Sequence, residues 1–92
     1  MKSIQAACKY FNVTEDELLD ENRKNGNISK ARHFIMWYHK HVLGESYASS
    51  ARAICMNHAS ALYGVKKLTK DIETNEELAD ELMKFTLSVT NI

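Results

Sequence analysis

The stretch Ser46–Ile72, SYASSARAICMNHASALYGVKKLTKDI, contains two helical patterns that are separated by a very short connection. Ser46 is a favourable N-cap for the first helix, and Asn57 is a favourable N-cap for the second. Cys55 and Met56, which precede Asn57, leave room only for a tight turn. We therefore predict a helix, a three-residue turn and a second helix over residues 46–72.

The second of these helices is amphipathic, with an apolar stripe on one side and polar residues on the other. The apolar stripe consists of Ala61, Leu62, Val65, Leu68 and Ile72. The polar face includes His58, Ser60, Tyr63, Lys67 and Lys70. A helix of this kind after a short turn is typical of the recognition helix that enters the DNA major groove in helix-turn-helix proteins.

The first residues of that helix have side chains suited to a groove. Ala59 and Ser60 are small enough to allow close approach, and the Ala59 methyl group is able to touch a thymine methyl group. Asn57, His58 and Ser60 carry groups that hydrogen-bond to bases or phosphates. We therefore expect residues 57–60 to face base edges.

The N-terminal part of the chain predicts two helices and an exposed loop. Apolar residues recur at helical spacing over residues 3–11, with Ser3 as the expected N-cap. The residues of this stripe are Ile4, Ala7, Cys8 and Phe11. Thr14-Glu15-Asp16-Glu17 is a capping box, which predicts a short helix to about residue 21. Residues 22–28, NRKNGNI, are turn-forming and basic and should form an exposed loop.

Two longer helices are predicted on either side of residues 46–72. A central helix should begin at Ser29 and end where Gly44 adopts the left-handed conformation. Its apolar stripe consists of Ala31, Phe34, Ile35, Tyr38 and Val42. Thr74-Asn75-Glu76-Glu77 repeats the capping-box pattern and predicts a last helix over about residues 75–89. Its core-facing residues are Leu78, Leu82, Phe85 and Val89, and its acids should face solvent.

Composition favours one all-α domain of about six helices over residues 1–92. The chain contains no proline and only three glycines, whereas a sheet protein needs many turn residues. Cys8 and Cys55 show no CxxC spacing, so neither a disulfide framework nor a metal site is expected. No targeting segment or apolar run of about 18 residues is present, which favours a cytoplasmic protein. We expect a monomer or a homodimer that needs no cofactor.

The charges are strongly segregated although the net charge is zero. Residues 23–70 hold nine of the twelve Lys and Arg residues but only one acid, Glu45, which gives this stretch a net charge of +8. All four histidines lie in the same stretch. Two of them, His39 and His41, are expected to be surface or half-buried residues. Such clustering is the electrostatic footprint of a phosphate-binding protein.

Several segments together resemble the C-terminal DNA-binding domain of the bacterial replication initiator DnaA, a helix-turn-helix domain of the Trp-repressor-like superfamily. The resemblance covers roughly residues 3–72. It rests on IQAACKYFNV (4–13), DELL (16–19), the basic loop, ARH (31–33), NHASAL (57–62) and KKL (66–68). In that family the basic loop enters the minor groove and the helix matching residues 57–60 reads the major groove.

The resemblance also implies individual DNA contacts. Arg23 or Lys24 would read the minor groove, while Arg32, His33 and Lys40 match family positions that contact DNA. Charge and resemblance together predict these DNA-binding residues: Arg23, Lys24, Lys30, Arg32, His33, Lys40, Tyr47, Ala48, Asn57, His58, Ala59, Ser60 and Lys67.

This chain departs from the family pattern in informative ways. Asn57 stands where the signature usually has Asp, and Ala59-Ser60 stand where two threonines are usual, so fewer hydroxyl contacts remain. The turn is one residue shorter, with Cys55-Met56 in place of the usual glycines. No GxxxxGK[ST] motif is present, so the ATPase of the initiator has no counterpart here.

Two functions follow from these observations. The first is sequence-preferring duplex DNA binding, in replication initiation or transcriptional regulation, by a protein that is not an enzyme. No Ser/His/Asp or Cys/His arrangement has motif support, because the carboxylates cluster at helix starts, where capping explains them. The alternative is a protein-interaction module that keeps the fold, has lost DNA reading and binds a replication or transcription protein.

Overall fold

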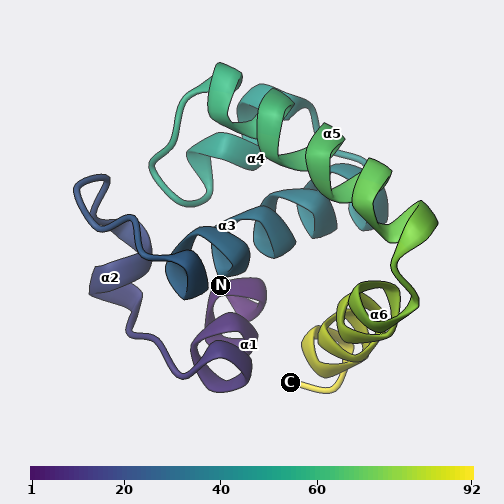
Figure 1. The fold of residues 1–92 in the computed structure, drawn as a ribbon. Coiled ribbons are helices and arrows are strands. Elements are labelled where there is room, and N and C mark those ends of the chain that lie inside the picture. Colours follow the sequence, from purple (N-terminus) through teal and green to yellow (C-terminus); the bar gives the residue numbers. More distant parts are fainter.

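All regular secondary structure in the computed structural model, which describes residues 1–92, is helical (Figure 1). The elements are α1 (Lys2–Phe11), α2 (Glu15–Leu19), α3 (Gly26–Trp37), the π-helical turn η1 (Tyr38–Val42), α4 (Tyr47–Arg52), α5 (His58–Thr74) and α6 (Glu76–Thr90). The prediction of an all-α protein with about six helices is confirmed. No helix is both long and apolar enough to cross a bilayer.

Helix α3 lies at the centre and contacts α1, α2, α4 and α5, as Figure 1 shows. Of the residues expected on its stripe, Ala31, Phe34 and Ile35 are fully buried and Tyr38 is nearly so. Phe34 packs edge-to-face against Phe11 of α1 and Phe85 of α6, with ring centroids 5.1 and 5.7 Å apart. Aromatic pairs of this geometry add stability beyond their buried area. This cluster joins the N-terminal and C-terminal helices across α3.

Most of the predicted helix caps are confirmed. Thr14 forms a complete capping box with Glu17. Ser46 Oγ accepts a hydrogen bond from Ser49 N, and Asn57 Oδ1 accepts one from Ser60 N. These bonds satisfy N–H groups that a helix start leaves without an intrahelical partner.

Two predicted caps are wrong. Ser3 is buried inside the first turn of α1, where its Oγ lies 2.7 Å from Nε2 of His39, and α1 begins without a side-chain cap. Thr74 is the last residue of α5, and Asn75 caps α6 by accepting a hydrogen bond from Leu78 N. Because Asn is at least as good an N-cap as Thr, the neighbouring residue takes the position.

The basic loop is shorter than expected, since α3 begins at Gly26 and not at Ser29. Asn25 Oδ1 caps the helix by accepting from Ile28 N, and Asn27 Nδ2 donates to the carbonyl of Phe11. The loop between α2 and α3 therefore consists of residues 20–25. These two hydrogen bonds hold its C-terminal end.

The π-helical turn at the end of the central helix was not anticipated. It rotates Val42, predicted on the buried stripe, into solvent, and His39 is buried at this level instead. His39 Nδ1 lies 3.2 Å from Oε2 of Glu45. Gly44 follows with φ of 72°, which confirms its predicted left-handed conformation.

The connection between α4 and α5 is longer than the predicted three residues. Helix α4 ends at Arg52, and residues 53–57 form the turn. Cys55 lies in the left-handed region with φ of 58°, and Met56 N donates to the carbonyl of Ala51. The left-handed residue turns the chain without the usual glycine, at a cost of about 1 kcal/mol.

Candidate nucleic-acid interface

The start of α5 is the most exposed part of the helix-turn-helix. Asn57, His58 and Ala59 are exposed, and Ser60 is half-buried. Asn57 uses Oδ1 for its cap, so its Nδ2 group stays available for an outside acceptor. No acid lies in the first turn of α5, so the partial positive charge of this helix end is not neutralised locally. The arrangement suits an approaching anion.

Three predicted DNA-binding side chains from different elements lie next to one another beside this helix start. The Lys40 ammonium group lies 5.0 Å from the centroid of the Tyr47 ring. The Tyr47 ring is edge-to-face with His58, with centroids 6.1 Å apart. Ala48, also predicted, is half-buried on the same short helix α4 as Tyr47. Elements η1, α4 and α5 therefore present a cation, a phenol and an imidazole on one patch.

The basic loop meets the other side of the α5 start. Lys24 lines a hollow of about 280 Å³ together with Asn57 and Ser60, and it lines a second hollow with Ser60 and Tyr63. Figure 1 shows the loop after α2 and the turn before α5 on the same side of the molecule. Arg23 is exposed on this loop, and its Nε lies 3.8 Å from Oδ2 of Asp20. Residues far apart in sequence thus share one surface.

Arg32 differs from the expectation of a DNA contact. Its side chain is buried, with only 3% of the residue exposed, and its guanidinium group donates hydrogen bonds to backbone carbonyls of residues 17–23. Four of the five N–H groups of the guanidinium are used in these bonds. The guanidinium group thus bonds to the inner side of the loop, and its contact with DNA stays a prediction.

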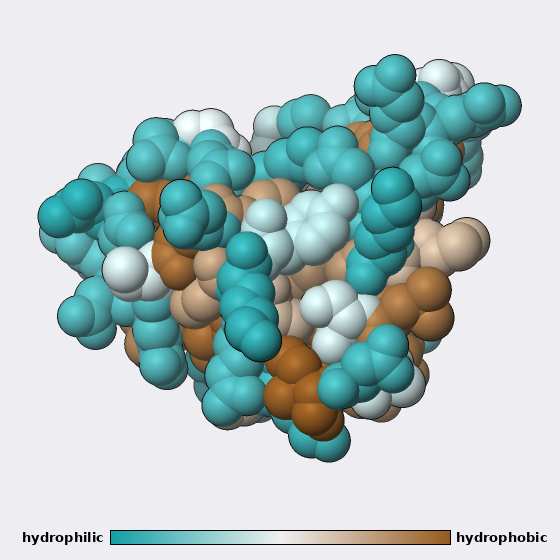
Figure 2. Space-filling model, turned by 90° about the horizontal axis from the view of Figure 1, so that it is seen from below, coloured by the Kyte–Doolittle hydropathy of each residue, from teal (hydrophilic) through white to brown (hydrophobic).

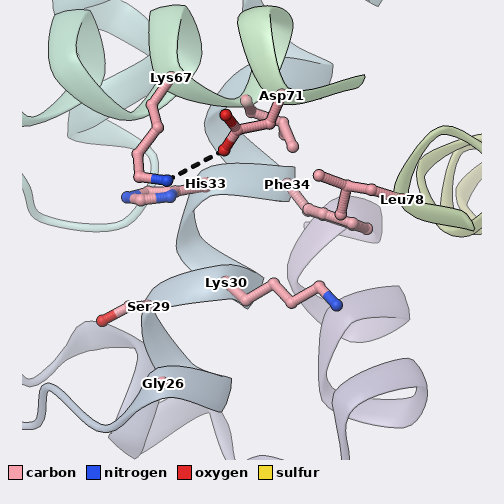
Figure 3. A pocket seen from close by; sticks show the side chains of 9 residues that line it. Gly26, Ser29, Lys30, His33, Phe34, Lys67, Asp71 and Leu78 are labelled. Atoms are coloured by element: carbon pink, nitrogen blue, oxygen red, sulfur yellow. Dashed lines mark hydrogen bonds and ion pairs between the residues drawn. The ribbon is translucent and has the colours of Figure 1, made fainter. Parts of the chain in front are cut away.

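His33 lies between α3 and α5, with Lys67 beside it (Figure 3). Its ring packs against Gly64, where a Cβ atom would come within 2.6 Å of the ring. Burial lowers the pKa of His33 below its usual value, and the neighbouring charges of Lys67 and Arg32 lower it further. Asp71 opposes part of this effect. The ring is therefore held in its neutral form near pH 7.

The two remaining predicted lysines each have an acidic partner. Lys67 Nζ lies 2.9 Å from Oδ2 of Asp71, a contact that raises the pKa of Lys67 (Figure 3). Lys30 Nζ lies 2.8 Å from Oε2 of Glu81 on α6. Lys30 thus points toward the acidic end of the molecule, whereas the other predicted cations lie near α5 or the loop.

Tyr63, Lys66 and Lys70 were not among the predicted site residues, yet they extend the same surface along α5. All three are exposed and line a shallow hollow of about 460 Å³ together with Lys67. The helical spacing of residues 63, 66, 67 and 70 placed them on one polar face, and this was the signal that could have added them. No three His, Cys, Asp or Glu side chains come together as they would to hold a metal ion.

The fold and this surface define a class: a helical bundle that presents a helix-turn-helix beside a basic loop. A family model described as bacterial DnaA protein helix-turn-helix matches residues 2–68. The chain belongs to this family. The resemblance inferred from the sequence is confirmed.

Three relatives share this region, and each is named chromosomal replication initiator protein DnaA. The protein of Desulfatibacillum aliphaticivorans is 28% identical over 76 residues, which cover 83% of this chain and 16% of the relative. The protein of Mycoplasma genitalium is 26% identical over 84 residues, which cover 91% of this chain and 19% of the relative. The protein of Mycoplasma pneumoniae is 27% identical over 77 residues, which cover 84% of this chain and 17% of the relative. The chain thus spans less than a fifth of the length of these relatives.

Proposed function

We propose that the chain binds duplex DNA, with the start of α5 in the major groove and the loop 20–25 at the neighbouring minor groove. The observation that carries this proposal is the shared surface of Lys24, Asn57 and Ser60, which brings the basic loop and the recognition helix together. A surface that reaches two adjacent grooves needs this proximity.

Phosphate contacts would position the protein on the duplex. Lys40 with Tyr47 lies on one flank of the α5 start, and Lys66, Lys67 and Lys70 continue along the helix. Cations on both flanks of a reading element fix its register on DNA, while the residues between them meet the bases. His58 and Ser60 are then the candidates for direct base readout.

The biological setting that fits best is replication initiation, with transcriptional regulation as its nearest variant. The family match and the relatives named as chromosomal replication initiators support the first. The chain contributes no ATP hydrolysis in this proposal, because its glycines at 26, 44 and 64 build no phosphate loop.

Selection of bound duplexes from a random library tests this function. We expect enrichment of one motif and weaker binding to single strands of the same sequence. If duplex binding is measurable but no motif is enriched, the proposed sequence preference is wrong. If no duplex binding is measurable, the proposed function is wrong.

An apolar groove favours the second candidate function, a protein-interaction module. Trp37, Ile72 and Leu82 line this groove, of about 350 Å³, together with exposed Met83 and Leu87 of α6. Figure 2 shows hydrophobic residues reaching the surface among hydrophilic ones on the side of the molecule that carries α1 and α6. Capture of a replication or transcription protein from nuclease-treated lysate, with no DNA binding by the chain, would favour this function.

A further inference from the structure

Two arginines of the basic region have opposite environments. Arg23 lies on the loop with 62% of its side chain exposed, whereas Arg32 on α3 is 3% exposed beneath that loop. A buried guanidinium group loses its hydration, so it stays in the core only where protein acceptors replace water. The acceptors therefore indicate what Arg32 does.

Four backbone carbonyls surround the guanidinium group. Nε donates to the carbonyl of Leu18 at 3.0 Å, and Nη1 donates to that of Arg23 at 2.6 Å. Nη2 donates to the carbonyl of Glu17 at 3.0 Å and also to that of Asp20. No other side chain in the molecule bonds to so many separate points of one segment.

These carbonyls belong to the end of α2 and to the loop that follows. The last carbonyls of a helix have no intrahelical partner, and a cation near them is favourable. Helix α2 has only five residues, so it contributes little order by itself. Within the loop, Asn22 N donates to Oδ1 of Asp20, and Arg23 N donates to the carbonyl of Asp20. Arg32 joins this local turn to the rigid central helix.

We propose that Arg32 is a positioning residue that holds the loop 20–25 in its DNA-binding shape before DNA arrives. Charge-assisted hydrogen bonds from a planar guanidinium group fix two carbonyls of α2 and two of the loop relative to α3. Arg23 and Lys24 are thereby presented beside the start of α5 without the entropic cost of ordering a mobile loop on binding. This role rests on the proposed function, since it assumes that the loop touches DNA.

The free protein provides the first test. We expect backbone ¹⁵N relaxation to give order parameters of about 0.85 for residues 20–25, as for the helices. Values below about 0.6 in the free protein would overturn the proposal, because the loop would then become ordered only on DNA. This measurement uses the wild type and does not depend on the folding of any variant.

A double-mutant cycle provides the second test. Arg32→Lys keeps the charge but cannot reach four carbonyls at once, and the pair Arg23→Ala with Lys24→Ala removes the cations that the loop presents. We expect Arg32→Lys to weaken duplex binding about tenfold in the wild-type background and less than twofold in the background without the loop cations. Arg52→Lys, an exposed arginine replaced in the same way, serves as the control and should change binding less than twofold.

The outcomes separate this proposal from the function on which it rests. Equal losses from Arg32→Lys in both backgrounds would show that Arg32 contacts DNA by itself and would overturn the positioning role alone. Absence of duplex binding by the wild type would overturn the proposed function and the role of the loop with it. Circular dichroism shows whether the Arg32→Lys variant folds. If the variant does not fold, the ¹⁵N relaxation of the wild type tests the positioning role of Arg32.

Discussion

Helices α5 and α6 begin in the same way but differ in their first turns. Each has an Asn N-cap whose Oδ1 accepts a hydrogen bond three residues on, Asn57 for α5 and Asn75 for α6. The first turn of α6 contains Glu76 and Glu77, whereas the first turn of α5 contains no acid. Carboxylates neutralise the positive end of α6, and the positive end of α5 stays open to a phosphate group or a base.

The same contrast extends to the surrounding sequence. Residues 71–92 contain six acids and one lysine, whereas residues 23–70 have a net charge of +8. Asp71 and Glu81 form ion pairs with Lys67 and Lys30, and Glu76 and Glu77 lie in the first turn of α6. The net charge of zero is therefore the sum of a basic region, residues 23–70, that would attract DNA and an acidic region, residues 71–92, that would repel it.

The largest effect is expected when α5 is made to resemble α6. Ala59→Glu places an acid in the first turn of α5, at the position that Glu77 has in α6. We expect duplex affinity to fall about a hundredfold or more, because the carboxylate would face phosphates or base edges. The free energy of unfolding should rise by about 0.3–1 kcal/mol, because the acid favours the helix end.

Anisotropy titrations and urea unfolding of the same preparation check both parts of this prediction. Loss of binding together with loss of stability would show damage to the fold and would not support the comparison. Ala59→Gln, which lacks the charge, is the matched control and should lose much less affinity.

A second prediction concerns base reading at the same helix start. His58→Ala should reduce affinity for the selected duplex by about 1–3 kcal/mol while leaving binding to random duplex within about twofold. The reason is that base contacts discriminate sequences, whereas phosphate contacts do not. Competition between selected and random duplex measures the difference, and an equal loss on both would place His58 on the backbone.

The third prediction concerns the packing that presents α5 on α3. Gly64→Ala should destabilise the protein by about 1–2 kcal/mol, because the new Cβ atom would lie 2.6 Å from the His33 ring and overpacking outweighs the gain in helix propensity. In a His33→Ala background the same change should stabilise by about 0.5–1 kcal/mol. Urea unfolding of the four proteins gives the cycle, and additivity would contradict the contact.

The neutral state of His33 predicts a pH dependence of stability. Because the pKa of His33 is lower in the folded than in the unfolded chain, the unfolded state binds more protons as pH falls through about 6.5. Stability should therefore decrease between pH 7.5 and pH 5.5, and less so in His33→Gln. The low pKa of Glu45 acts in a more acidic window: its partial burial would raise that pKa, but the hydrogen bonds from Ser49 and His39 outweigh this. Unfolding midpoints of the wild type and of His33→Gln at pH 7.5 and pH 5.5 check the role of His33. Identical losses of stability in both proteins would refute it.

The smallest effect on duplex affinity is expected from a change at the start of α6. Glu77→Ala removes one of the acids at the start of α6 and should lower the free energy of unfolding by about 0.3–1 kcal/mol. Duplex affinity should stay within about twofold, because α6 lies away from the proposed interface. A clear gain in affinity would mean that the acids of α6 act on DNA at long range.

The helix starts could be predicted from sequence because caps are local. Asn57, Ser46 and Thr14 act within three or four residues, so their patterns are visible in the chain itself. The left-handed Gly44 belongs to the same group. The prediction of an N-cap at Ser3 was wrong because its hydroxyl group is buried and bonds to His39, a partner 36 residues away.

The role of Arg32 could not be predicted in this way. An arginine within a basic stretch has the sequence signature of a surface cation, and its burial depends on how α2 and the loop fold over α3. The π-helical turn that buries His39 likewise follows from contacts with α1 and Glu45. Such tertiary contacts decide which of several similar cations face solvent.

The salt dependence of duplex binding tests the central claim, that the basic surface around α5 binds DNA, most directly. For the wild type, raising the salt concentration from 50 to 200 mM should weaken binding by more than a hundredfold, as about four or five phosphate contacts require. Absence of binding at 50 mM, or an affinity that does not change with salt, would contradict the claim.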